Sequence, residues 1–161
     1  MSANGRAEEI HHGDGRLSFH PAYFNTRFRV EQMPSSWPES FVIVTAYATT
    51  GEQWSDEENE RADEALRRRL NELDVWITRI TGFYHGIGHT EPGWAVESDL
   101  ATGIGLGRDY RQDAIFHVEG DRLAVVSCAE QDVAAVGSFR ERVDPAATQA
   151  FAINTQSLDL P

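Results

Sequence analysis

One run constrains the fold of this chain more than any other, Phe-Val-Ile-Val-Thr-Ala-Tyr at residues 41–47. The run is apolar, rich in β-branched residues and of strand length, which predicts a buried central β-strand. The loop that follows it leads to Ser55 and Glu58, whose spacing is that of a capping box. Apolar residues then recur at helical spacing, so the sequence predicts a helix over residues 56–73.

The rest of the chain repeats this alternation of strands and helices. Apolar runs predict further strands at residues 75–84, 94–97, 114–119 and 122–128, and a short strand at 24–30. A second helix is expected over residues 99–111, with Ser98 as its cap. Gly120-Asp121 between the last two runs is a hairpin signal. This order predicts an α+β fold, a ferredoxin-like or split β-α-β sandwich of about five strands with helices on one face.

The 161 residues suffice for one domain with its own core. We expect a flexible arm over residues 1–16, a single α+β domain over 17–143, and a C-terminal helix or tail over 144–161. The chain shows no leader-like start and no run of about 18 apolar residues, so we expect a cytoplasmic protein. The lone Cys128 excludes an internal disulfide and fits a reducing compartment.

The charge of the chain limits its partners. It has 26 acidic and 14 basic residues, for a formal net charge of -12. Such a charge disfavours direct nucleic-acid binding, and it suits a basic protein partner or plain solubility. All the basic residues are Arg, so chemistry that requires a catalytic or phosphate-loop lysine is excluded.

Three polar residues lie where the first strong strand ends and the helix begins. Thr45 and Tyr47 share a strand face that is otherwise apolar, and Asn59 continues the buried stripe of the helix. The carboxyl end of a strand that feeds a helix is a common place for a ligand crevice. These side chains therefore either bind a ligand or satisfy the backbone of the nearby loop, and for Asn59 we favour the loop.

The stretch His85-Gly-Ile-Gly-His89-Thr-Glu91 carries the strongest chemical signal. Two imidazoles and a carboxylate at this spacing could serve as metal ligands, so His85, His89 and Glu91 are weak metal candidates. His89 and Glu91 point the same way in an extended chain, as an acid/base pair requires, and are our catalytic candidates. An ordinary polar turn is the alternative, and Gly103, Gly105 and Gly107 are interpreted as helix packing instead of a nucleotide loop.

Several of these residues together resemble a widespread bacterial family known only as a domain of unknown function. The shared pattern comprises Tyr23 with Thr26, Thr45-Ala46-Tyr47, Ser55 with Asn59, His89 with Glu91-Pro92, and Gln112 with Ala114. Ala48-Thr49 departs from the family's Asn-Pro, and Gly93 stands in place of its Ser. The resemblance implies a common grouping of Thr45, Tyr47, Asn59, His89, Glu91 and Gln112, but it implies no reaction.

Two functions follow as hypotheses, and neither a cofactor nor a reaction is indicated. The first is a site for a small-molecule or nucleotide-like ligand, which Thr45, Tyr47, Asn59 and Gln112 would bind. The site could also be hydrolytic, with Glu91 as the acid/base and His89 as its partner. The second is a non-enzymatic acidic protein-interaction module in which the same residues brace loops. A concave pocket around these residues would favour the first hypothesis.

Overall fold

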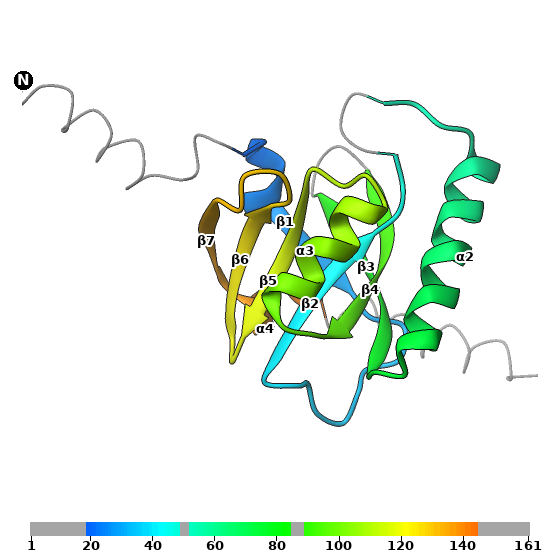
Figure 1. The fold of residues 1–161 in the computed structure, drawn as a ribbon. Coiled ribbons are helices and arrows are strands. Elements are labelled where there is room, and N and C mark those ends of the chain that lie inside the picture. Colours follow the sequence, from blue (N-terminus) through cyan, green and yellow to red (C-terminus); the bar gives the residue numbers. More distant parts are fainter. Residues whose placement is uncertain (1–18, 49–51, 85–88, 145–161) are drawn as a thin grey trace, which may run out of the picture.

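The computed structural model describes residues 19–48, 52–84 and 89–144 (Figure 1). Its elements in chain order are η2 (Pro21–Asn25), β1 (Thr26–Arg29), β2 (Ser40–Thr45), α2 (Asp56–Leu73), β3 (Ile77–Tyr84), β4 (Thr90–Glu97), α3 (Leu100–Asp109), β5 (Ala114–Glu119), β6 (Arg122–Ser127), β7 (Val133–Ser138) and α4 (Phe139–Arg142). The element η2 is a 3-10 helix.

The strands form one sheet in the order β1-β3-β4-β2-β5-β6-β7. Every neighbouring pair is antiparallel. Strand β2 lies at the centre, between β4 and β5. Helix α2 connects β2 to β3, and α3 connects β4 to β5, so each helical crossover skips one strand.

The prediction of a five-stranded ferredoxin-like or split β-α-β sandwich is wrong for this molecule. The sheet has seven strands and curls into a half-barrel (Figure 1). Strand β1 extends one edge, and β6 with β7 extends the other. Strand β7 was missed because its sequence, Val-Ala-Ala-Val-Gly-Ser, is dominated by small residues and carries little strand propensity. The curl itself has no signature in the hydrophobic pattern.

Strand β2 is buried on both faces, which explains its nearly continuous apolar sequence. On one face Val42 and Val44 belong to a core cluster with Leu66 of α2 and Ile104 of α3. On the other face Phe41 and Ile43 lie in the cluster that contains Phe139 of α4. The helices therefore occupy both faces, contrary to the expectation of one covered face.

Helix α3 approaches the sheet closely because two of its residues lack a side chain. A Cβ on Gly103 would lie 2.5 Å from Val42 Cγ1, and one on Gly107 would lie 2.5 Å from Cys128 Sγ. Close packing is thus confirmed for these two glycines. Gly105 faces open space and has no such role.

The two edges of the curled sheet are tied together by α4 and the two residues that follow it. Val143 pairs with Phe28 of β1, and the Asp144 amide donates to the Phe28 carbonyl at 2.8 Å. Arg142 donates to the carbonyls of Phe24 and Thr26. These bonds anchor η2 and β1 at one open end of the half-barrel.

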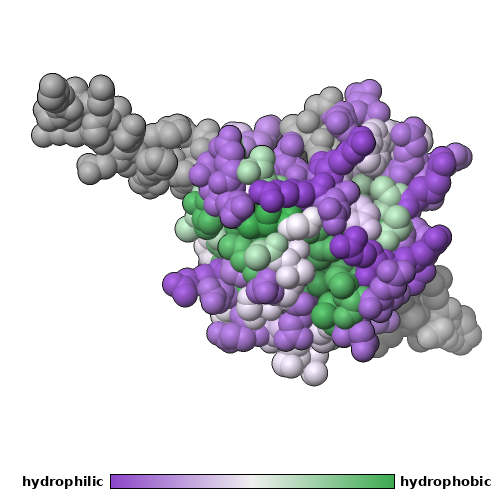
Figure 2. All heavy atoms as spheres, in the orientation of Figure 1, coloured by the Kyte–Doolittle hydropathy of each residue, from purple (hydrophilic) through white to green (hydrophobic). Residues whose placement is uncertain are grey.

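The predicted helix over residues 56–73 is confirmed, with Ser55 accepting a hydrogen bond from the Glu58 amide. The second helix begins at Leu100, and Asp99 caps it in place of Ser98. The predicted arm over residues 1–16, and the tail after Asp144, lie outside the described residues. Among the described helices none is long and apolar enough to cross a membrane. The face shown in Figure 2 is mostly hydrophilic at its outer edge, with apolar surface nearer its centre.

Candidate functional site

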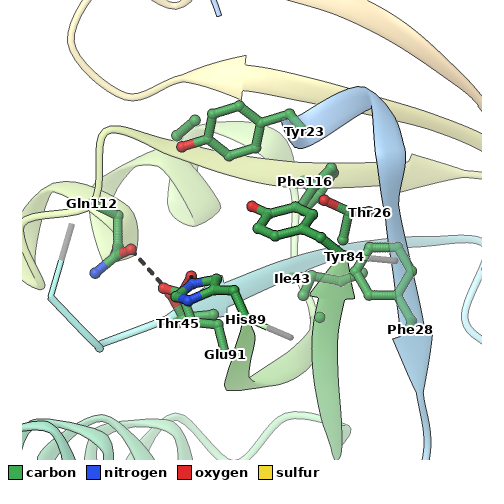
Figure 3. A pocket seen from close by; sticks show the side chains of 12 residues that line it. Tyr23, Thr26, Phe28, Ile43, Thr45, Tyr84, His89, Glu91, Gln112 and Phe116 are labelled. Atoms are coloured by element: carbon green, nitrogen blue, oxygen red, sulfur yellow. Dashed lines mark hydrogen bonds and ion pairs between the residues drawn. The ribbon is translucent and has the colours of Figure 1, made fainter. Parts of the chain in front are cut away.

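A small pocket of about 60 Å³ opens at one end of the sheet (Figure 3). In an antiparallel sheet the end of one strand lies beside the start of its neighbour. The ends of β2 and β3 and the starts of β4 and β5 therefore meet here, and η2 lies against them. The lining residues are Tyr23, Thr26, Phe28, Ile43, Thr45, Gly82, Tyr84, His89, Glu91, Gln112, Ala114 and Phe116.

Three polar side chains from separate parts of the chain meet at the hydroxyl of Thr45. This hydroxyl lies 2.7 Å from Glu91 Oε1 and 2.9 Å from Gln112 Oε1. Both partners are acceptors and the hydroxyl has a single proton, so Thr45 donates to one of them at a time. The donation to Glu91 is the stronger of the two because the acceptor is charged.

Backbone carbonyls that follow β2 and α3 fix the Gln112 side chain. Its amide nitrogen donates to the carbonyls of Tyr47, at 2.9 Å, and Tyr110, at 3.1 Å. Both amide protons are thereby used, and Gln112 Oε1 is directed to Thr45. Gln112 is consequently a positioning residue that links the ends of β2 and α3.

The second carboxylate oxygen of Glu91 lies beside His89. This oxygen, Oε2, lies 3.6 Å from His89 Nε2, and the Glu91 side chain is 25% exposed. The His89 ring stacks on the Tyr84 ring, with centroids 5.6 Å apart and planes at 12°. Tyr84 therefore holds the imidazole beside the carboxylate.

Two phenol groups line the same pocket. Burial raises the pKa of Tyr23 above its ordinary value, and the neighbouring Tyr84, Asp113 and Glu91 raise it further. Burial is also the main cause of the raised pKa of Tyr84, and a hydrogen bond with Thr26 lowers this pKa in part. Both phenols therefore stay uncharged and retain their protons as hydrogen-bond donors at neutral pH.

The inner wall of the pocket is apolar. Phe28 is 1% exposed and Ile43 is 4% exposed. Phe116 packs edge-on against both Phe28 and Tyr23. Gly82, between these residues and Glu91, contributes no side chain, so the space in front of the carboxylate stays open.

The structure brings together four of the six residues that the sequence grouped. Thr45, His89, Glu91 and Gln112 line the pocket, whereas Tyr47 and Asn59 do not. Asn59 Oδ1 accepts a hydrogen bond of 2.9 Å from the Ala48 amide, which confirms that it braces the loop. Burial raises the pKa of the Tyr47 phenol, and the charge of Asp63 on α2 raises it further.

The metal candidates are only partly placed. His85 lies outside the described residues, while His89 and Glu91 are neighbours. Across residues 19–48, 52–84 and 89–144, no three His, Cys, Asp or Glu side chains form a group that could hold a metal ion.

Tyr23, Thr26 and Tyr84 are lining residues that were not among the predicted site residues. Tyr23 and Thr26 carried a signal, because the resemblance includes them as an early Tyr-x-x-Thr pair. Tyr84 carried none, since an aromatic residue at the end of an apolar strand is usually part of the core.

Fold and site together define a small domain with a curled antiparallel sheet and a polar pocket at its open end. Residues 44–115 match the model of a family described as Protein of unknown function (DUF3293). The expected resemblance to a domain of unknown function is thereby confirmed for a segment that contains Thr45, His89, Glu91 and Gln112, and Tyr23 and Thr26 precede it. Comparisons with curated proteins and with solved structures find no significant match.

Proposed function

We propose that the pocket binds a small organic molecule that carries an ammonium or similar cationic group, and that Glu91 is its counter-charge. The observation that carries this proposal is the environment of Glu91. Thr45 donates to one oxygen of its carboxylate, the other oxygen lies 3.6 Å from His89 Nε2, and four Phe and Tyr side chains line the same pocket. A carboxylate with adjacent aromatic faces suits a cation, through charge pairing and cation–π attraction.

The lining also disfavours an anionic ligand. No Arg is among the residues that line the pocket in the described part of the chain, and the sequence has no Lys. Among the described lining residues the basic side chain is His89, which is already beside Glu91. A phosphate group would face the Glu91 carboxylate without a cationic partner, so this lining argues against a nucleotide.

Three four-carbon probes test the proposal, because they differ only in the charge of one end. We expect 1-aminobutane to bind at pH 8 in isothermal titration calorimetry, and 1-butanol and butanoate to bind at least about tenfold more weakly. Glu91→Gln should reduce the affinity for 1-aminobutane by about tenfold or more. The matched control is Glu97→Gln, the same change at the exposed far end of β4.

Either of two outcomes would overturn this proposal. One is equal affinity for 1-aminobutane and 1-butanol, and the other is unchanged affinity in Glu91→Gln. Absence of binding by all three probes would overturn it as well, and it would favour the acidic protein-interaction module, the second hypothesis from the sequence.

Hydrolysis is a second candidate function, favoured by the 3.6 Å approach of His89 Nε2 to Glu91 Oε2. A carboxylate beside an imidazole can take a proton from water. N-Butylacetamide provides a test, because its hydrolysis consumes one water and yields acetic acid and 1-aminobutane. Hydrolysis is supported if the protein releases 1-aminobutane from N-butylacetamide and Glu91→Gln abolishes this release. If the protein binds 1-aminobutane but releases none from the amide, the pocket is a binding site only.

A further inference from the structure

A second and wider cavity, of about 340 Å³, adjoins the pocket. The two cavities share Tyr23, Gln112 and Ala114 among their lining residues, so they adjoin at these three residues. The second cavity extends toward Ser127 and Ala129, at the turn between β6 and β7. The two cavities are therefore neighbours along η2 and the start of β5.

The second cavity also carries negative charge. Asp113, just before β5, and Glu130, in the turn after β6, both line it. Their side chains lie in exposed positions. Burial is the largest cause of the raised pKa of the Tyr23 phenol, and Tyr84 is the next. The charges of Asp113 and Glu91 raise this pKa further. Tyr23 thus lies within electrostatic range of a carboxylate from each cavity.

Positive charge is scarce along the whole path. No Arg lines either cavity in the described part of the chain. The basic side chains that do are His89 and His20, and His20 Nδ1 already accepts a hydrogen bond from the Ala22 amide. Two acidic ends separated by an aromatic ring are complementary to a molecule with a cation at each end and an apolar chain between them.

We propose that the adjoining cavities together bind a linear α,ω-diamine, with one ammonium at Glu91 and the other at Asp113. The methylene chain passes the ring of Tyr23, where apolar and cation–π contacts are available. This inference rests on the proposed function, because it assigns the first ammonium to the same carboxylate. It adds the second cavity, the second charge and the class of ligand.

The test compares diamines of three to six carbons with 1-aminobutane at pH 8 and low salt. We expect the best diamine to bind about five- to tenfold more tightly than 1-aminobutane, since the second ammonium meets a partly solvated carboxylate. Asp113→Asn should remove this advantage and leave the affinity for 1-aminobutane within about twofold. Glu119→Gln, the same loss of charge at the exposed far end of β5, is the control.

A structural measurement distinguishes the second cavity from a general charge effect. Ser127 and Ala129 line the second cavity and not the first. Their amide signals in NMR spectra should shift with the diamine and stay in place with 1-aminobutane.

Failure of this inference can be told apart from failure of the proposed function. If 1-aminobutane binds through Glu91 and no diamine binds more tightly, the diamine inference is overturned and the proposed function stands. A diamine advantage that survives Asp113→Asn also overturns the inference. If neither amine binds, both are wrong.

Discussion

Gly82 faces Glu91 across the β3–β4 pair, and the missing side chain keeps the pocket open. A Cβ at this position would lie 3.4 Å from Thr26 Cγ2 and 3.9 Å from a ring carbon of Phe28, which is ordinary contact. We therefore expect Gly82→Ala to change the free energy of unfolding by less than about 1 kcal/mol, because Ala costs nothing extra in a strand. The added methyl group occupies the pocket, so the affinity for 1-aminobutane should fall about threefold or more.

Calorimetry and urea unfolding measure these two effects separately. The matched control is Gly105→Ala, on α3, where an added Cβ meets no atom within 4 Å. A Gly82→Ala protein that binds 1-aminobutane as well as the native chain would show that the ligand does not enter this space.

Gly93 has a different role, because it faces Thr45 across the β2–β4 pair. A Cβ there would lie 2.7 Å from Thr45 Cγ2 and 2.7 Å from the Val44 carbonyl oxygen. We expect Gly93→Ala to lower the free energy of unfolding by about 1–3 kcal/mol, the usual cost of overpacking. The displaced Thr45 would also lose its bond to Glu91, so the affinity for 1-aminobutane should fall as well.

Urea unfolding and calorimetry on Gly93→Ala check both parts of this prediction. Native stability and native affinity in the variant would mean that the two strands separate there without cost.

Among the elements, α2 is held to the sheet by a polar contact as well as by its buried leucines. Asp63 accepts hydrogen bonds from Arg79 at 2.7 Å and from Trp94 Nε1 at 3.1 Å, and Arg79 stacks over Trp94. The Asp63 side chain is 14% exposed and that of Arg79 is 26% exposed. We expect Asp63→Ala to lower the free energy of unfolding by about 1–3 kcal/mol, because Trp94 and Arg79 lose a shared acceptor.

Hydrogen exchange locates this effect. The amides of α2 should lose more protection than those of β2, since the contact joins only the helix to β3 and β4. Glu64→Ala is the control, because its pair with Arg67 lies on the solvent side of the same helix and should contribute nothing measurable. Uniform loss of protection across the sheet would contradict a local role for Asp63.

The sequence predicted elements well where the local pattern agreed with the tertiary structure. Ser55 and the apolar stripe placed α2 at residues 56–73, the bounds that the structure has. Strand β4 was placed at residues 94–97 but begins at Thr90. Glu91-Pro92-Gly93 has the composition of a turn, yet all three residues pair with β3, and Gly93 also pairs with β2. Strand β7 has weak propensity of its own and gains its place by pairing with β6.

The site could be predicted in part for a similar reason. Thr45 follows from strand alternation, and His89 and Glu91 from a local cluster of polar groups. Tyr23 reaches the pocket only because the sheet curls and the segment around Arg142 and Val143 anchors η2 and β1. Contacts between distant strands of this kind leave no local pattern, so residue periodicity could not place them.

For the molecule as a whole, the burial of a thiol and two phenols in their neutral form predicts how the free energy of unfolding changes at alkaline pH. Burial raises the pKa of the Cys128 thiol from its ordinary 9.0 to about 11, although Arg108 lowers it in part. The unfolded chain therefore loses this proton at lower pH than the folded protein does. Stability from burying the neutral thiol is fully present below pH 9.0, and it is lost as the pH rises toward 11. The raised pKa values of Tyr23 and Tyr84 act in the same direction.

We accordingly expect the urea midpoint of unfolding to be constant from pH 7 to 8.5 and to fall progressively between pH 9 and pH 11. Cys128→Ala, which removes one of the titrating groups, should show a shallower fall over the same range.

The Cys128 thiol of the folded protein should also react slowly with iodoacetamide at pH 8, because the thiolate is the nucleophile and little of it is present. A midpoint that is unchanged up to pH 10.5, or native Cys128 alkylated as fast as the thiol in urea, would show that the thiol is not held in its neutral form. Cys128 packs against Gly107 of α3, and its amide donates to the Asp113 carbonyl between the lining residues Gln112 and Ala114. Its ionisation would therefore loosen the packing beside this part of the pocket lining. The affinity for an amine should consequently fall over the same pH range as the stability, in addition to any loss from deprotonation of the amine itself.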